Sequence, residues 1–399
     1  MPVPPIVGLE IGTAKTVALV GETREDNHLM ITGMGEQISS GVRKGEIIDL
    51  ENAVTCLRSV LEMAEESGRV SIRQVYLAIS GGHIQGLVNR GVVPVLDEDG
   101  EITRDDIDQA MEVARAVNLP ADREVLHTVC QHYCIDDQTR VLRPEGMEGA
   151  QLALDMLVLH GIRARLNNTV RVVRSIPLDV QDVAFSGLCS ALSVLTPEQK
   201  KSGVVVIDLG AGTTDYLSYA NNVVATAGAL GVGADHVTND ITLAFTIPIS
   251  QAERLKRESG SAVITATNPS QKVVLPPEGG FPGRSVSLRA LHTVINARVE
   301  EIFMMIRKRL EKAGVGHHVG AGVVLTGGGA HLKGVADLGE KVFGMPCSIG
   351  RPRHVSGLAT ATEGPEYAAC SGLVQYGFRT NGGPHAISPF GWLRGLFGR

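Results

Sequence analysis

The sequence predicts an α/β protein with a duplicated core, and two matching segments lead to this class. One apolar, β-type run near the N-terminus continues as VGLEIGTAKT, and a second run near the middle continues as VVVIDLGAGTTD. In each segment an acid, Glu10 or Asp208, ends the run and a turn containing Gly and Thr follows. Because the two segments lie about half a chain apart, the pattern indicates two related halves, each built around a strand, a turn and a second strand.

An acid followed by a glycine-rich hairpin suits the chemistry of phosphate binding. Glycines let backbone N–H groups close around phosphate oxygens, Thr hydroxyls add donors, and the acid can hold Mg²⁺ through water. Two such hairpins facing each other would clamp one polyphosphate from both sides. Either segment alone is equally well read as a plain β-turn, but the pair at equivalent places favours the phosphate site.

A third glycine cluster, TGGGAHLKG, follows the helical stretch RVEEIFMMIRKRLEKAG and another apolar run. Bare glycines at a strand end let a flat ring approach the backbone, so this cluster could form the floor of an adenosine site, with an ordinary loop as the alternative. Neither the P-loop pattern nor a complete G-x-G-x-x-G before a helix is present, which excludes the commoner nucleotide folds.

Composition narrows the class of protein further. The formal net charge of −6 argues against a nucleic-acid binder held by a general basic field. Six cysteines without a framework of spacings indicate reduced thiols in a cytoplasm. We expect no signal peptide and no membrane-spanning helix, since no apolar run reaches the roughly 18 residues required.

With these three stretches in this order, the chain resembles the actin and heat-shock chaperone ATPase superfamily, and within it the FtsA family of bacterial cell-division proteins. The segments that carry the narrower resemblance run from about residue 6 to the end of the chain. They are GLEIGTAK, VYLAISGGHI, VLHTVCQHYCID, LCSALSVLTPEQ, IDLGAGTTD, VTNDI, AERLKRESG, TGGGAHLKG and EYAACSGLVQYG, together with an aromatic tail.

The resemblance implies a duplicated actin-like ATPase fold, with two ribonuclease-H-like halves around a nucleotide cleft. Subdomain IA would take residues 1–82 and 162–200, including a linking helix at about 181–195, and residues 83–161 would form the inserted subdomain IC. Subdomain IIA would comprise 201–228 and 300–378, and subdomain IIB 229–299. A flexible linker, 379–388, and an amphipathic membrane-targeting helix, 389–399, would end the chain.

The resemblance also implies ATP and Mg²⁺ as ligands and assigns residues to them by motif. The implied nucleotide residues are Gly12, Thr13 and Lys15 in the first hairpin, Asp208, Gly210, Gly212, Thr213 and Thr214 in the second, and Gly233, Glu253, Lys256, Gly327, Gly328 and Gly329 around the nucleoside. Lys256 could equally be a solvated helix residue. Glu10 and Asp208 would hold Mg²⁺ through water, and no catalytic residue can be named.

Glu10 departs from the wider superfamily, where most members carry Asp. The extra methylene displaces the carboxylate by more than an ångström, which alters how an octahedral Mg²⁺ and its waters sit. FtsA proteins often accept this Glu, so the family resemblance stands. We expect at most a slow ATPase, with the nucleotide acting mainly as a structural and regulatory ligand.

HTVCQHYC contains zinc-type ligands but does not predict a zinc site. On a strand, Cys130, His132 and Cys134 would share one face at about 6.6 Å per pair, too far apart for donors that must lie about 2 Å from one zinc ion. His317 and His318 follow a helix end and are expected in an exposed loop or cap.

The last residues, SPFGWLRGLFGR, predict an interfacial helix. On a helical wheel the apolar side chains share one side and glycines the other, with arginines at the edges for anionic lipid. The membrane-contacting residues would be Phe390, Trp392, Leu393, Arg394, Leu396 and Phe397. The alternative is a terminal helix docked on its own domain, which the Gly-, Pro- and Asn-containing linker disfavours. One tail should bind weakly, and many tails on a polymer tightly.

The family resemblance therefore implies a cytoplasmic cell-division protein that polymerises on the inner face of the membrane at mid-cell, anchors the FtsZ ring there and recruits later divisome proteins through subdomain IC. The FtsZ C-terminal peptide would dock on IIB, where Arg284 and Arg298 match basic positions of the family, although both could be ordinary surface arginines. Two alternatives share the fold: a small-molecule kinase, for which no carboxylate base can be identified, and a PilM-type pilus-assembly homologue, which the aromatic tail disfavours.

Overall fold

The computed structural model describes residues 4–24, 28–97, 99–264, 270–277, 282–316 and 319–380. The amphipathic helix expected at 389–399, most of the linker before it, and the pair His317 and His318 lie outside the described residues. Within them, no helix combines the length and hydropathy needed to cross a membrane.

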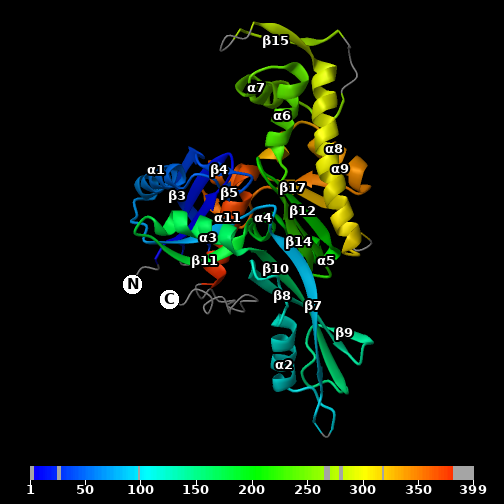
Figure 1. Cartoon of the computed structure of the whole chain (residues 1–399). Coiled ribbons are helices and arrows are strands. Elements are labelled where there is room, and N and C mark those ends of the chain that lie inside the picture. The colour runs from blue at the N-terminus through cyan, green and yellow to red at the C-terminus, as the bar shows by residue number, and fades with distance from the viewer. Residues whose placement is uncertain are drawn as a thin grey trace.

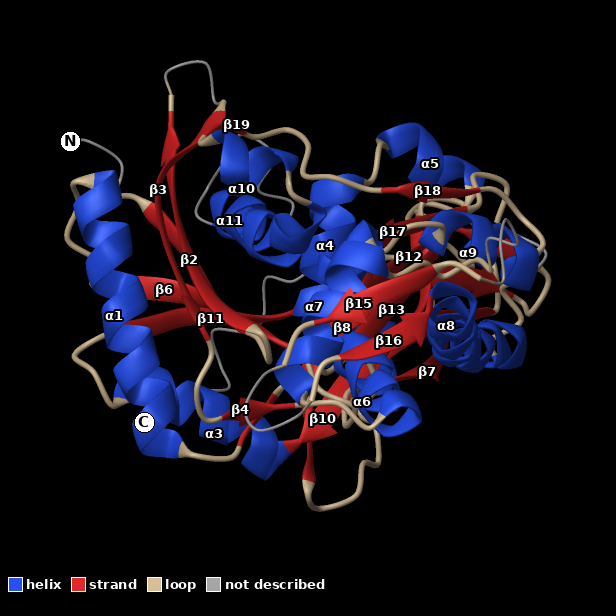
Figure 2. Ribbon diagram, turned by 90° about the horizontal axis from the view of Figure 1, so that it is seen from above, coloured by secondary structure: helices blue, strands red, loops and turns tan. Residues whose placement is uncertain are grey.

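Two sheets form the body of the molecule (Figures 1 and 2). The first has the order β11-β6-β1-β2-β3-β19 and the second continues β18-β17-β12-β13-β14 into four further strands. The first contains β1 (Ile6–Ile11), β2 (Lys15–Thr23), β3 (Leu29–Ile38), β6 (Gln74–Ile79), β11 (Asp179–Phe185) and β19 (Ser356–Gly357). The second contains β12 (Val204–Leu209), β13 (Thr214–Ala220), β14 (Val223–Leu230), β17 (Val323–Thr326) and β18 (Cys347–Ile349).

The predicted duplication is confirmed by the strand order and direction. In the first half β1 pairs antiparallel with β2 and parallel with β6, and β11 continues the parallel side. In the second half β12 pairs antiparallel with β13 and parallel with β17, and β18 continues the parallel side. The third strand of each half, β3 or β14, lies antiparallel beside the second. Each acid-ending apolar run is thus the central strand of its own half.

An inserted lobe leaves the first half after β6 and lies at one end of the molecule in Figure 1. It contains β7 (Gln85–Pro94), α2 (Arg104–Arg115), β8 (Arg123–Ile135), β9 (Thr139–Val141) and β10 (Gln151–Ile162). A single residue pair, Gly228 with Gln85, joins its strand β7 to β14 of the second half. The Gln131 side chain adds hydrogen bonds of 2.8 and 3.0 Å to the carbonyls of Val224 and Ala225.

The second lobe, at the opposite end in Figure 1, is helical with a short hairpin. It contains α6 (Ala234–Phe245), α7 (Ile249–Ser259), β15 (Lys272–Leu275), β16 (Arg284–Ser287) and the long helix α8 (Leu288–Lys312). The remaining elements are β4 (Val42–Arg43), β5 (Glu46–Ile47), α1 (Leu50–Gly68), α3 (Arg163–Arg174), α4 (Ser186–Val194), α5 (Pro197–Ser202), η1 (Gly328–His331), α9 (Val335–Phe343), α10 (Ala359–Glu363), η2 (Pro365–Tyr367) and α11 (Ala368–Thr380).

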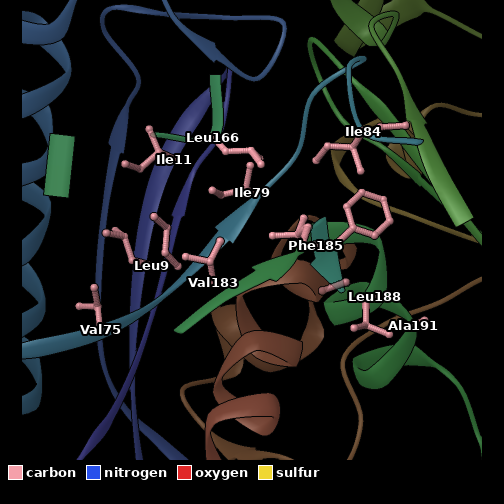
Figure 3. Close-up of a cluster of buried hydrophobic side chains, with 14 of the residues drawn as sticks. Leu9, Ile11, Val75, Ile79, Ile84, Leu166, Val183, Phe185, Leu188 and Ala191 are labelled. Carbon is pink, nitrogen blue, oxygen red and sulfur yellow. The ribbon is translucent and has the colours of Figure 1, made fainter. Parts of the chain in front are cut away.

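Helix α4 occupies the centre of the molecule, and every one of its residues is buried. Its residues Leu188 and Ala191 pack with Phe185 and with side chains of the first sheet in one apolar cluster (Figure 3). The linking helix expected at about 181–195 is therefore shorter than predicted, because residues up to Phe185 belong to strand β11. A helix without a polar face holds the two halves against each other through apolar burial.

The HTVCQHYC segment forms a strand, β8, as the argument against zinc assumed. The three ligand-type side chains do not share one face, however, because a bulge shifts the register between Cys130 and His132. Cys130 is exposed and Cys134 is buried. Among the described residues no group of three or more His, Cys, Asp or Glu side chains could hold a metal ion there or elsewhere.

Candidate functional site

The two glycine hairpins have the same backbone geometry. The Gly12 N–H donates to the Lys15 carbonyl at 3.1 Å, and the Gly210 N–H donates to the Thr213 carbonyl at 3.0 Å. Each bond closes a four-residue turn between the first and second strands of its half. The two segments thus form the same kind of turn with different side chains at three of its four positions.

The tips of the two hairpins meet, with the β4–β5 turn packed between them. A Cβ on Gly212 would lie 2.7 Å from the Lys44 Cα and would also collide with the Thr13 hydroxyl. The Gly45 N–H donates to that same Thr13 hydroxyl at 2.9 Å. Only glycine therefore fits at position 212.

Both hairpins and the third glycine cluster line one cavity of about 730 Å³. The implied ligand residues that line it are Glu10, Gly12, Thr13, Lys15, Asp208, Gly210, Gly212, Thr213, Glu253, Lys256, Gly327, Gly328 and Gly329. A cavity of this size, with glycines and charged groups converging on it, suits a small charged ligand.

Thr214 and Gly233 support the second hairpin from behind and are not among the residues that line the cavity. Thr214 is fully buried, and its hydroxyl donates to the Val232 carbonyl at 2.7 Å. A Cβ on Gly233 would lie 2.5 Å from the carbonyls of Gly210 and Ala211. The structure therefore gives both residues a packing contact with the hairpin.

Three carboxyl groups gather where the hairpins meet. Burial and the neighbouring Asp208 raise the pKa of Glu10 to about 8, against an opposing effect of Lys15. Burial raises the pKa of Asp208 to about 6, and burial together with Asp208 raises that of Asp215 well above its ordinary value. Crowded buried carboxylates of this kind call for a proton or a cation as counter-charge.

Two serines, the partly exposed Ser80 and the buried Ser190, hold the acids of the second half. The Ser80 hydroxyl donates to Asp215 Oδ1 at 2.5 Å and to the Thr213 hydroxyl at 3.1 Å. Ser190, on the buried helix α4, donates to Asp208 Oδ2. Ser80 directly follows β6 of the first half, so this contact joins the two halves beside the cavity.

The third glycine cluster lies directly under the second hairpin. Gly327 has a φ of 81°, and a Cβ there would lie 2.8 Å from the Leu209 carbonyl and collide with the Asp208 carboxylate. A Cβ on Gly329 would overlap the Leu209 side chain. Packing against the second hairpin therefore excludes side chains at these two positions, and the adenosine site stays a prediction.

The two implied lysines both have carboxylate partners. Lys15 Nζ lies 2.9 Å from Glu36 Oε2 and 3.5 Å from the centre of the Tyr367 ring. Lys256 Nζ lies 2.7 Å from Glu253 Oε2, 2.8 Å from the Thr238 hydroxyl and 3.1 Å from the Ala234 carbonyl. Lys256 is therefore a bonded residue of the cavity wall rather than a solvated helix residue.

Sequence reasoning missed several cavity residues: Glu36, Ser80, Asp215, Asp235, Arg257, His331, Lys333, Glu366 and Tyr367. Asp215 had a signal, since it ends the GAGTTD motif two residues after the turn. Glu36 and Glu366 had none, because strand pairing and the packing of distant segments bring them here. Glu366 accepts a 2.6 Å hydrogen bond from His331.

Arg284 and Arg298 both reach helix α6. Arg298 forms bonds of 2.6 and 3.0 Å to the Asp240 carboxylate and also pairs with Glu301. Arg284 is exposed and donates to the Phe245 carbonyl. The structure thus places the pair on one side of the helical lobe, with Arg298 already neutralised by acids.

The duplicated sheets around a shared cavity define an actin-like protein. The chain is similar to the PilM–PilN type IV pilus biogenesis complex, with a TM-score of 0.65 at 16% identity over 94% of this chain and 99% of that one. It is also similar to MreB5 of Spiroplasma citri bound to ADP, with a TM-score of 0.56 at 13% identity over 95% and 97% of the two chains. Identities this low show the fold alone.

The chain belongs to the FtsA family of cell division proteins. The model of "Cell division protein FtsA" matches residues 205–372, and the model of the "SHS2 domain inserted in FTSA" matches residues 81–160. The chain is 35% identical to FtsA of Pseudomonas aeruginosa, over 94% of its own length and 89% of that protein. It is 36% identical to FtsA of Escherichia coli K12, over 93% and 90% of the two chains.

Proposed function

We propose that this protein binds ATP with Mg²⁺ in the cavity and acts in cell division as an actin-like filament former. It anchors the FtsZ ring to the cytoplasmic membrane and recruits later divisome proteins. One observation carries the nucleotide part of the proposal: two equivalent hairpins, one from each half, meet over buried carboxyl groups. Solved structures of the same fold are described as bound to ADP and to AMPPNP, which supports it.

The residues present fit a magnesium–nucleotide complex. Backbone N–H groups of the hairpin turns and the hydroxyls of Thr13 and Thr213 supply donors for phosphate oxygens. Glu10 and Asp208, with raised pKa values, would hold Mg²⁺ through water, and the ion would supply the missing counter-charge. With Glu10 in place of the shorter Asp, we expect slow hydrolysis at most.

Calorimetry on nucleotide-stripped protein tests this part. Titration with ATP in the presence of Mg²⁺ should give saturable binding, which chelation of the metal weakens. Absence of heat at millimolar ATP would overturn the proposal. A phosphoryl-transfer screen with small acceptor alcohols, run beside it, would detect a kinase of the same fold.

The membrane part of the proposal rests on the C-terminal segment 389–399. Deleting it should convert mid-cell membrane bands in cells into diffuse staining, and liposome pelleting of the full chain should rise cooperatively with protein concentration. Unchanged bands in the deletion variant would contradict the anchor. A strictly linear pelleting isotherm would contradict the coupling of assembly to attachment.

The FtsZ part rests on the two arginines beside α6. An acidic peptide docking there must share Arg298 with Asp240, so Arg284, which pairs with a carbonyl rather than a carboxylate, should contribute more. Arg284→Ala should weaken co-sedimentation with FtsZ, and Arg289→Ala, an exposed arginine at the start of α8, is the matched control. Equal effects of both substitutions would reject this docking site.

A further inference from the structure

Lys15, the cation of the first hairpin, is paired with an acid inside the cavity. Its Nζ lies 2.9 Å from Glu36 Oε2, and the two side chains are 23% and 35% exposed. Both residues line the cavity. A half-buried pair of this kind is screened less than a surface ion pair, so it holds the ammonium against competing anions.

Strand register creates this pair. Lys15 lies opposite Ile38 and Val17 opposite Glu36 in the β2–β3 ladder, so Lys15 and Glu36 are diagonal neighbours on one face. The Tyr367 ring lies against the Lys15 ammonium, and a hydrogen bond to Glu36 helps burial raise the pKa of the Tyr367 hydroxyl. Glu36 is thus held in place from a second side.

The lining of the cavity as a whole carries more acidic than basic side chains. Seven acids line it against four lysines and arginines. Lys256 has three partners of its own, a carboxylate, a hydroxyl and a carbonyl, and is built into the wall. Of the two cavity lysines with a carboxylate partner, Lys15 is therefore the one whose transfer to a phosphate breaks a single ion pair.

We propose that Glu36 is an intramolecular competitor that sets the affinity of the cavity for nucleotide, because a phosphate takes Lys15 only by displacing this carboxylate. The proposal rests on nucleotide binding as proposed above and adds the residue that regulates it. Glu36 holds Lys15 in the empty cavity, and the terminal phosphates of a nucleotide release it.

A double-mutant cycle tests the competition. The affinity for ATP with Mg²⁺ is measured by calorimetry for the native chain, Glu36→Gln, Lys15→Met and the double variant, with thermal melting to verify folding. Glu36→Gln should tighten binding by about 3- to 10-fold, the range of one partly exposed ion pair. In the Lys15→Met background the same substitution should leave the affinity unchanged.

Glu311→Gln is the charge-matched control, since Glu311 pairs with Arg307 on α8 and does not line the cavity. It should leave affinity unchanged. Weaker binding by Glu36→Gln would show that the carboxylate positions Lys15 for the phosphate, and an equal gain in the Lys15→Met background would show a general field effect; either result overturns the proposal. Absence of binding by all four proteins would instead reject the nucleotide function itself.

Discussion

The first and second hairpins form the same kind of turn but carry different side chains. Aligned on their closing hydrogen bonds, Gly12-Thr13-Ala14-Lys15 corresponds to Gly210-Ala211-Gly212-Thr213. The first carries the cation and a hydroxyl at its tip, and the second carries a glycine against which that tip packs. Duplication has therefore preserved the backbone, while the side chains have become complementary rather than equal.

The acids behind the two turns differ in the same way. Ser190 donates to Asp208, whereas within the described part of the chain no side-chain hydroxyl donates to Glu10. Burial raises the pKa of Asp208 to about 6, against the Ser190 hydrogen bond, and burial together with the neighbouring Asp208 raises the pKa of Glu10 to about 8. Of these two acids, Asp208 is the one whose charged form a serine hydroxyl stabilises.

Substitution at the packed tip should have the largest effect. Gly212→Ala places a methyl group against Thr13 and the Lys44 backbone, which forces the hairpins apart. Overpacking of this kind costs about 1–3 kcal/mol, so ATP affinity should fall by roughly 10- to 100-fold. Calorimetry on folded protein measures this affinity.

The reciprocal change, Ala14→Gly at the equivalent position, is the control. It removes a methyl group and should change affinity by less than about 3-fold, the effect of added chain flexibility alone. Similar losses of ATP affinity for both substitutions would mean that close packing at Gly212 is not the cause of the effect.

The acid of the first half should make stability depend on pH. Its folded-state pKa of about 8 lies above the ordinary 4.5, so the native state keeps a proton that the unfolded chain has lost, and stability falls as pH rises through this interval. Between pH 6.5 and 8 in metal-free buffer the loss should be about 1–2 kcal/mol. His83 and His127, whose pKa values are lowered to about 4, act in the opposite direction only below about pH 6.5.

Urea unfolding of the native chain, Glu10→Gln and Glu311→Gln measures this slope. Glu10→Gln should reduce this slope, because a neutral amide does not titrate, while Asp215, whose pKa is also raised by burial and Asp208, keeps part of it. Glu311→Gln on the surface of α8 should leave the slope unchanged. An unchanged slope in Glu10→Gln would assign the titration to another group.

Loss of the hydroxyl that joins the halves should have the smallest effect. Ser80→Ala removes the bonds to Asp215 and Thr213 and should lower the free energy of unfolding by about 0.5–1.5 kcal/mol. Ser175→Ala, whose exposed hydroxyl bonds the Arg171 carbonyl, should cost less. Equal losses would indicate that Ser80 contributes no more than a surface hydroxyl.

Local patterns were sufficient to predict the duplicated core. Glu10 and Asp208 end strands, and the glycines after them form turns, because turn chemistry acts over four neighbouring residues. The third glycine cluster was placed at a strand end by the same reasoning. Helix α4 was recognised, but its start was not, since the residues before Ser186 extend a parallel strand whose partner β6 lies about a hundred residues away.

Contacts between residues far apart in the sequence could not be predicted from local sequence patterns. Glu36 meets Lys15 through strand register, Ser80 meets Asp215 across the two halves, and Ser190 meets Asp208 through a buried helix. No short motif encodes such pairs. The bulge at Gln131, which separates the ligand-type residues of β8, also depends on the partner strand β10 rather than on local propensity.

Strand β7 of the inserted lobe pairs with the second sheet at one residue pair, Gly228 with Gln85. Each half completes its own five strands without that lobe, whose outer end, around α2 and β9, lies away from both halves in Figure 1. A replacement of different length or shape would need to reproduce this strand pair, the hydrogen bonds of Gln131 and the buried side chains that β8 and β10 add to the core. Evolution is thereby free to redesign what this end of the molecule presents to its surroundings while the cavity at the centre keeps its chemistry.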